Sequence, residues 1–242
     1  MNTLKKLPLF LSFLLLFSCD EFSNKLSDSE IAAGLKSALE VGANYALKTL
    51  GSENGFLLDQ AVKIGLPEDA ADLIKLAASV PIFNVMAKEL EERLIRTINR
   101  AAETAIDDVI PIVINAITDM TIQDAQAILF SSNEIAATDY LRVKTYDPLT
   151  VVCRSVIQDA LNKKIILDTS AQDVWGELTR FYNQVAVLIP SARPIETNLS
   201  LYATQKALDG VFLKVGNEEV KIRTDASARI NDLLKRVFGQ LD

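Results

Sequence analysis

Two groups of polar side chains have the types and spacing needed to bind an anion or to move a proton. In the first group, Tyr140, Arg142 and Lys144 occupy alternate positions beside Asp139. An arginine next to a tyrosine can hold a carboxylate or a phosphate through paired hydrogen bonds. The commoner use of such an arginine is a structural pair with Asp or Glu between packed helices, so both roles stay open and the structural one is favoured.

The second group lies near the C-terminus. Tyr202, Lys206 and Asp209 are spaced at about i, i+4 and i+7, which places them on one side of a helix. A lysine beside a carboxylate could do acid–base work if it were buried, because burial lowers a lysine pKa. Charge pairing within the helix is the commoner role. We expect the charged surface to be extended by Glu218, Glu219, Lys221, Arg223 and Arg229, of which Arg223 is a further candidate for binding.

The chain contains no histidine. This excludes Ser-His-Asp and Cys-His nucleophile pairs, histidine-ligated zinc and histidine general bases. Chemistry based on carboxylates, lysine or oxygen-ligated calcium or magnesium is still open. Neither a DxDxDG calcium loop nor a GxxxxGK phosphate loop is present in the sequence. We therefore expect no metal, no cofactor and no catalytic residue.

Cysteine occurs twice, at Cys19 and Cys153. Cys153 follows Val151 and Val152 in an apolar run, where a buried and inert thiol is more common than a reactive one. If Cys19 carries a lipid, Cys153 is the only remaining thiol, and no intramolecular disulfide can form. Packing must then stabilise the fold.

The N-terminus has the features of an export signal. Lys5 and Lys6 precede an apolar segment, residues 7–17, which is too short to span a bilayer. The segment ends in Leu-Phe-Ser-Cys at residues 16–19, which resembles the lipobox of bacterial lipoproteins. The resemblance implies cleavage after residue 18 and diacylation of Cys19, and two acyl chains give stable anchoring where one does not. An ordinary cleaved signal or an uncleaved anchor are the alternatives.

The sequence thus predicts three parts: a signal peptide at residues 1–18, a lipidated tether at 19–26 and a single helical domain at 27–242. The tether can reach at most about 25 Å. The protein is expected in the bacterial cell envelope, attached to a membrane through Cys19 and either periplasmic or surface-exposed. The membrane and leaflet stay open.

Charge argues against nucleic acid as a partner. The chain has 25 basic and 32 acidic residues, and loss of the signal removes only Lys5 and Lys6, so the net charge falls from −7 to about −9. Such a surface has no net basicity with which to neutralise phosphates. An envelope protein is a more plausible partner.

Apolar residues recur at helical spacing along the chain, and we predict an all-α, single compact irregular bundle of about nine or ten helices without strands. Capping patterns begin helices at Ser27, Thr121, Ser170, Asn198 and Asp225. Prolines are expected to begin separate helices at Pro67, Pro111 and Pro148. Residues 51–66 form a long connection. Gly34 and Gly42 inside the first helix indicate close approach of another helix.

Four separated motifs carry a family resemblance. They are ALKTLGSENGF (46–56), AVKIGLP (61–67), MTIQDAQAIL (120–129) and ALDGVFLKVGNEEVKIRTDASARINDLLKRVFG (207–239). Together they resemble a bacterial family catalogued as domain of unknown function 4197, over about residues 27–239. The chain departs from the family pattern at residues 58–60 and at Ala226, both loop or cap positions. The resemblance implies an exported, often lipid-modified helical protein, and it transfers no activity and no catalytic residues.

Three functions compete. The leading one is a non-enzymatic, lipid-anchored domain that binds a partner or scaffolds an assembly. The alternative is a carrier or sensor of an apolar ligand such as a lipid, because an all-α domain can enclose a cavity between its helices. A histidine-independent enzyme is third.

Overall fold

The computed structural model describes residues 26–68, 70, 84–166, 169–187 and 193–240. Seven α-helices make up most of this part of the chain. They are α1 (Asp28–Gly51), α3 (Asn84–Thr118), α4 (Ile122–Leu129), α5 (Ala136–Asn162), α6 (Ala171–Ala186), α7 (Leu199–Thr224) and α8 (Asp232–Phe238). A short 3-10 helix, η1 (Ala226–Ala228), links α7 to α8. None of the described helices is both long enough and apolar enough to cross a bilayer.

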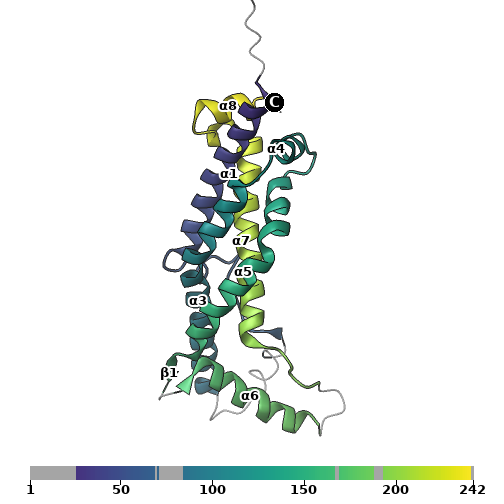
Figure 1. Cartoon of the computed structure of the whole chain (residues 1–242). Coiled ribbons are helices and arrows are strands. Elements are labelled where there is room, and N and C mark those ends of the chain that lie inside the picture. Colours follow the sequence, from purple (N-terminus) through teal and green to yellow (C-terminus); the bar gives the residue numbers. More distant parts are fainter. Residues whose placement is uncertain (1–25, 69, 71–83, 167–168, 188–192, 241–242) are drawn as a thin grey trace, which may run out of the picture.

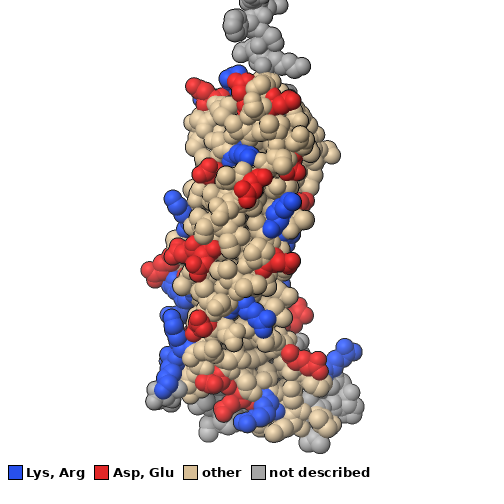
Figure 2. Space-filling view, in the orientation of Figure 1, with Lys and Arg blue, Asp and Glu red and all other residues tan. Residues whose placement is uncertain are grey.

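The four long helices α1, α3, α5 and α7 lie side by side along one axis and form an elongated column (Figure 1). The short helices α4 and α8 lie at the end where α1 begins. Helix α6 crosses the opposite end of the column (Figure 1). Acidic and basic side chains are interspersed over the visible face, as Figure 2 shows. The predicted all-α bundle is therefore confirmed in its class.

The predicted helix starts follow from side-chain caps. Ser27 accepts a hydrogen bond from the Glu30 N–H while Glu30 accepts one from the Ser27 N–H, and Thr121 and Asp124 do the same at α4. Asn198 caps α7 by accepting the Leu201 N–H at 3.0 Å. Each cap satisfies backbone donors that have no partner inside the helix.

The prediction that Pro111 and Pro148 each begin a new helix is wrong. Helix α3 runs through Pro111 and α5 runs through Pro148, although an interior proline removes one backbone hydrogen bond. Both prolines face solvent, whereas Val109 and Val113 on one helix and Leu149 on the other are buried. Packing on both sides of each proline outweighs its local cost. The predicted nine or ten helices are accordingly too many for the described residues, and the helix predicted from Pro67 lies mainly outside them.

Two further details differ from the prediction. Strands β1 (Lys164–Ile166) and β2 (Thr169–Ser170) pair as a short antiparallel ladder. They are too short to show the alternation that identifies a strand in sequence. Asp225 caps η1 and not the last helix, which Asn231 caps instead. Ile230, which directly precedes this cap, is exposed.

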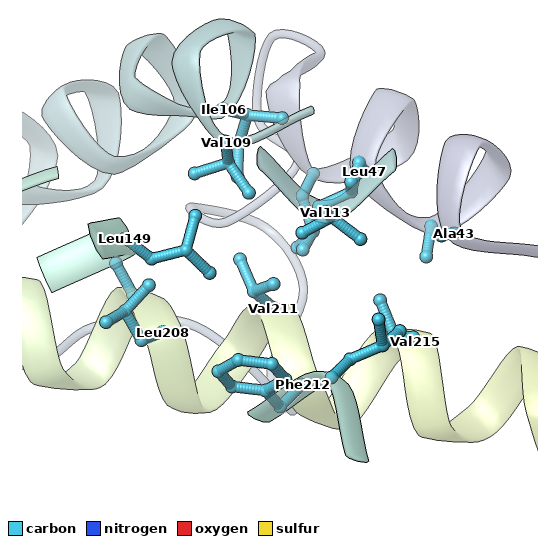
Figure 3. Close-up of a cluster of buried hydrophobic side chains, with 14 of the residues drawn as sticks. Ala43, Leu47, Ile106, Val109, Val113, Leu149, Leu208, Val211, Phe212 and Val215 are labelled. Carbon is cyan, nitrogen blue, oxygen red and sulfur yellow. The ribbon is translucent and has the colours of Figure 1, made fainter. Parts of the chain in front are cut away.

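All four long helices contribute to one apolar core. Figure 3 shows side chains from these helices turned toward a shared interior. The buried residues drawn there include Ala43 and Leu47 of α1, Ile106, Val109 and Val113 of α3, Leu149 of α5, and Leu208, Val211, Phe212 and Val215 of α7. Because α7 faces α1, α3 and α5, its position is fixed along its length.

Gly34 allows α8 to lie against α1, as its place in the sequence predicts. A Cβ at Gly34 would lie 2.4 Å from Cγ2 of the buried Val237. In contrast, a Cβ at Gly176 in α6 would meet nothing within 4 Å. The two glycines therefore differ in packing while both lie inside a helix.

We expect Gly34→Ala to lower the free energy of unfolding by about 1–2 kcal/mol, because overpacking costs more than the helix propensity of alanine returns. Gly176→Ala should raise it by about 0.5–1 kcal/mol through propensity alone. Urea unfolding of the full chain followed by circular dichroism measures both. Equal stabilisation by the two substitutions would contradict the close packing of α1 and α8.

Candidate functional site

The connection between α1 and α3 is held in place by a buried asparagine. Asn99 of α3 accepts the N–H of Ile64 at 2.9 Å and donates to the carbonyl of Ile64 at 2.7 Å. Both the asparagine and Ile64 are buried. A buried amide that satisfies both polar groups of one residue fixes that part of the backbone.

A buried carboxylate, one turn further along α3, holds the start of the same connection. Oε1 of Glu103 accepts the N–H groups of Phe56 at 3.1 Å and Leu57 at 3.2 Å. Its Oε2 accepts from Nη1 of Arg100 at 2.6 Å. Because Glu103 is almost fully buried, these hydrogen bonds offset the cost of burying its charge. The connection is therefore ordered at two points.

A pocket of about 300 Å³ lies between this connection and α7. One wall is the backbone and side chains of the connection, and the other is one side of α7. Its lining comprises Ala61, Val62, Lys63, Ile64, Gly65, Tyr202, Lys206, Asp209, Gly210 and Leu213. The structure thus brings Tyr202, Lys206 and Asp209 together at one pocket, as their spacing predicts.

Gly210 sets how closely α7 approaches the connection. A Cβ at this position would lie 2.9 Å from Cε1 of Phe56 and 3.2 Å from Cβ of Val62. The buried Phe56 is itself fixed through the backbone contact with Glu103. The separation of the two pocket walls is therefore built into the packing below them.

Two polar side chains of the pocket, Tyr202 and Lys206, differ in burial and in hydrogen bonding. The hydroxyl of Tyr202 donates to the carbonyl of Leu66 at 3.3 Å, and burial followed by the charge of Glu68 raises the pKa of Tyr202, so it stays a neutral donor. Lys206 is exposed, with Nζ 6.0 Å from the ring centre of Tyr202. The acid–base role considered for Lys206 requires a buried lysine, which this is not.

Asp209 pairs across the helices and not within α7. Its Oδ1 lies 3.7 Å from Nη1 of Arg142 on α5, and the Arg142 guanidinium lies 4.5 Å from the ring centre of Phe212. This is the interhelical Arg–Asp pair that the sequence favoured over ligand binding. Arg142 thus lies beside a residue of the pocket lining without lining the pocket itself.

The first predicted cluster does not stay together. Tyr140 lies toward α4, with its hydroxyl 3.5 Å from Oδ2 of Asp124, and Lys144 lies 5.6 Å from the Tyr140 ring centre. Arg142 points to α7 instead. Residues two apart on a helix diverge by about 200°, so Tyr140 and Arg142 cannot share a face. Tyr140 and Lys144 are therefore separated from the pocket residues.

Arg223 is buried and belongs to a structural network, which corrects its prediction as a surface binding residue. Its guanidinium donates to Oε1 of Glu219 from Nε at 3.0 Å and from Nη2 at 2.9 Å. It also donates to the carbonyls of Ile128 and Leu129, which end α4. With all these partners inside the bundle, Arg223 is unavailable to a ligand.

Glu219 completes the network from the same helix. Its carboxylate accepts the N–H of Ala137 at 2.9 Å and both the N–H and the hydroxyl of Thr138, at 2.7 and 2.8 Å. The first turn of α5 lacks a side-chain cap of its own. Glu219 therefore caps α5 from α7, and the prediction of an exposed Glu219 is wrong.

Sequence reasoning missed three polar residues of this region. Asn99 and Glu103 hold the connection in place, and Lys63 lines the pocket. Asn99 and Glu103 are spaced i, i+4 among the apolar residues Ile98, Ala102 and Ala105, and polar residues within an apolar stripe are a signal of buried hydrogen bonding. Lys63 offers no such signal, because its neighbours in the pocket come from a helix far along the chain.

Cys153 is buried, as predicted. Desolvation, followed by the negative charge of Asp108, raises the pKa of Cys153 to about 12. A thiol with so high a pKa is almost entirely protonated near neutral pH and is a poor nucleophile. Within the described residues, no group of three or more Cys, Asp or Glu residues is arranged to hold a metal ion.

The buried pair on α7 has a matched exposed counterpart. Glu219 and Arg223 are i, i+4 neighbours with side chains 3% and 6% exposed, whereas Glu89 and Arg93 have the same spacing on α3 with side chains 60% and 45% exposed. We expect Glu219→Gln or Arg223→Gln to cost about 3–5 kcal/mol, because each leaves a buried charge without its partner. A double-mutant cycle from urea unfolding should give a large coupling energy for the buried pair.

The same cycle on Glu89 and Arg93 should give less than about 0.5 kcal/mol, because water screens that pair. Similar coupling energies for the two pairs would show that the buried network adds nothing beyond local helix pairing.

Comparison with known proteins agrees with the resemblance noted in the sequence. The family model for DUF4197, described as a protein of unknown function, matches residues 25–239. This region contains the pocket, the buried residues Asn99 and Glu103 that hold its connection wall, and all seven described α-helices. Neither a curated protein nor a solved structure matches the chain significantly. The chain therefore belongs to the DUF4197 family of proteins of unknown function.

Proposed function

We propose that this protein is a lipid-anchored lipoprotein of the bacterial cell envelope that binds its ligand, without catalysis, in the pocket between residues 61–65 and α7. The observation that carries the binding function is the pocket itself. The buried Asn99 and Glu103 fix the wall formed by the connection, and the other wall is the packed helix α7, so a ligand would meet a largely preformed site. Preformed sites lose less entropy on binding.

The lipid anchor rests on the sequence. The basic residues before an apolar segment, and the Leu-Phe-Ser-Cys at residues 16–19, support processing at Cys19. The tether would join the column at the start of α1, the end that also carries α8 (Figure 1). The pocket lies far from that end. From Lys206 to the end of α7 at Thr224, the helix rises by about 27 Å.

The chemistry of the pocket supports binding over catalysis. Lys206 is exposed and Asp209 is paired with Arg142, so these two residues are not arranged as an acid–base pair. A cavity lined by Leu35, Ala38, Leu39, Glu219, Ile222, Arg223 and Phe238 has a volume of only about 10 Å³, far too small for an acyl chain. That cavity lends no support to the alternative of an apolar carrier.

The anchor is tested by labelling cells with radioactive palmitate. Cys19→Ala should abolish incorporation and release the protein from the membrane fraction, because no acyl chain can then be attached. Cys153→Ala is the matched control and should keep both label and retention. Equal membrane retention of the Cys19→Ala variant would refute the anchor.

Ligand binding is tested by placing a photo-crosslinking amino acid at Leu213, which lines the pocket and is 44% exposed. A control variant carries it at the exposed Phe181 in α6. After irradiation of cells, intact-mass spectrometry should find a discrete adduct at position 213 and not at 181. No adduct, or the same adducts at both positions, would refute the pocket as the binding site.

A further inference from the structure

Two lysines at the pocket have no acidic partner among the described residues. Lys63 and Lys206 line opposite walls, and both are exposed. Within the described part of the chain, neither ammonium has a carboxylate at ion-pair distance. Asp209, the carboxylate in the lining, is paired with Arg142 instead. Both ammonium groups are thus available to a ligand.

The backbone adds a further donor. Gly65 lies on the pocket wall, next to Ile64, whose N–H and carbonyl are both held by Asn99. No acceptor for the Gly65 N–H occurs among the described residues, and a Cβ on Gly65 would meet nothing within 4 Å. A ligand atom can therefore approach this backbone closely.

The pocket is positive on an acidic protein. Two lysines, Lys63 and Lys206, and one carboxylate, Asp209, make up the charged lining, whereas the whole chain has a net charge of −7. A concave site with a net charge of one sign concentrates small ions of the opposite sign. Arginine forks suit planar carboxylates, but Arg142 lies outside the pocket lining and beside Asp209 and Phe212. Lysines act as point charges and commonly bind phosphate.

We propose that the pocket binds the phosphate group of a small soluble molecule through Lys63 and Lys206, with the Gly65 N–H as a third donor. Val62 and Leu213 supply apolar contact for the rest of the ligand. A volume of about 300 Å³ fits a small solute. The distance of the pocket from the proposed membrane end favours a soluble phosphate over a lipid headgroup. This inference rests on the proposed function, since it names the ligand of the same pocket.

The test is calorimetric titration of the full chain, purified in detergent, with inorganic phosphate at low ionic strength. Lys63→Gln and Lys206→Gln should each weaken binding by about fivefold or more, because each removes one ammonium contact. Lys88→Gln is the control: it removes the same charge from an exposed site on α3 and should change the affinity less than twofold. No saturable binding, or equal loss in Lys88→Gln, would overturn the proposal.

A second arm identifies the source of the phosphate. Glycerol 3-phosphate and dihexanoyl phosphatidate carry the same headgroup without and with acyl chains. Equal affinities support a soluble ligand, and at least tenfold tighter binding of phosphatidate would overturn that part of the proposal. A crosslinked adduct at position 213 without phosphate binding would leave the proposed function standing and overturn this inference alone.

Discussion

The column depends on one buried ion pair, because Glu219 and Arg223 join the ends of two helices to a third. Glu219 accepts the first free N–H groups of α5, and Arg223 donates to the last carbonyls of α4. Neither charge is solvated, so each is stable only while the other and the helix ends are in place. The pair thus sets where the chain turns from α4 into α5 and how both lie against α7.

The same helix carries the pocket, and its lining residue nearest to the ion pair, Leu213, lies six residues before Glu219. Helix α7 is held by the ion pair near its C-terminal end and by apolar packing with α1, α3 and α5 along its middle (Figure 3). Opposite the pocket face, Asn99 and Glu103 fix the connection that forms the second wall. Buried polar contacts therefore position both walls, while the groups left at the pocket surface are those suited to meet a ligand.

Local signals in the sequence predicted much of this fold. Ser27, Thr121 and Asn198 begin helices because capping depends on residues only a few positions apart. Pro111 and Pro148 led to a wrong prediction of helix boundaries. Their neighbours are buried by helices that are distant in sequence, which a local pattern does not show. The spacing of Tyr202, Lys206 and Asp209 correctly predicted one face. Lys63 and the interior position of Glu219 depend on tertiary contacts, which spacing within one segment cannot reveal.

Hydrogen exchange at the N-terminal turn of α5 tests the role of the buried pair most directly. Amides in the first turn of a helix have no intrahelical acceptor and ordinarily exchange fast. Glu219 holds the N–H groups of Ala137 and Thr138 inside the bundle. We therefore expect these two amides to exchange as slowly as the amides in the core of α5. Exchange at the rate of a frayed helix end would contradict the account.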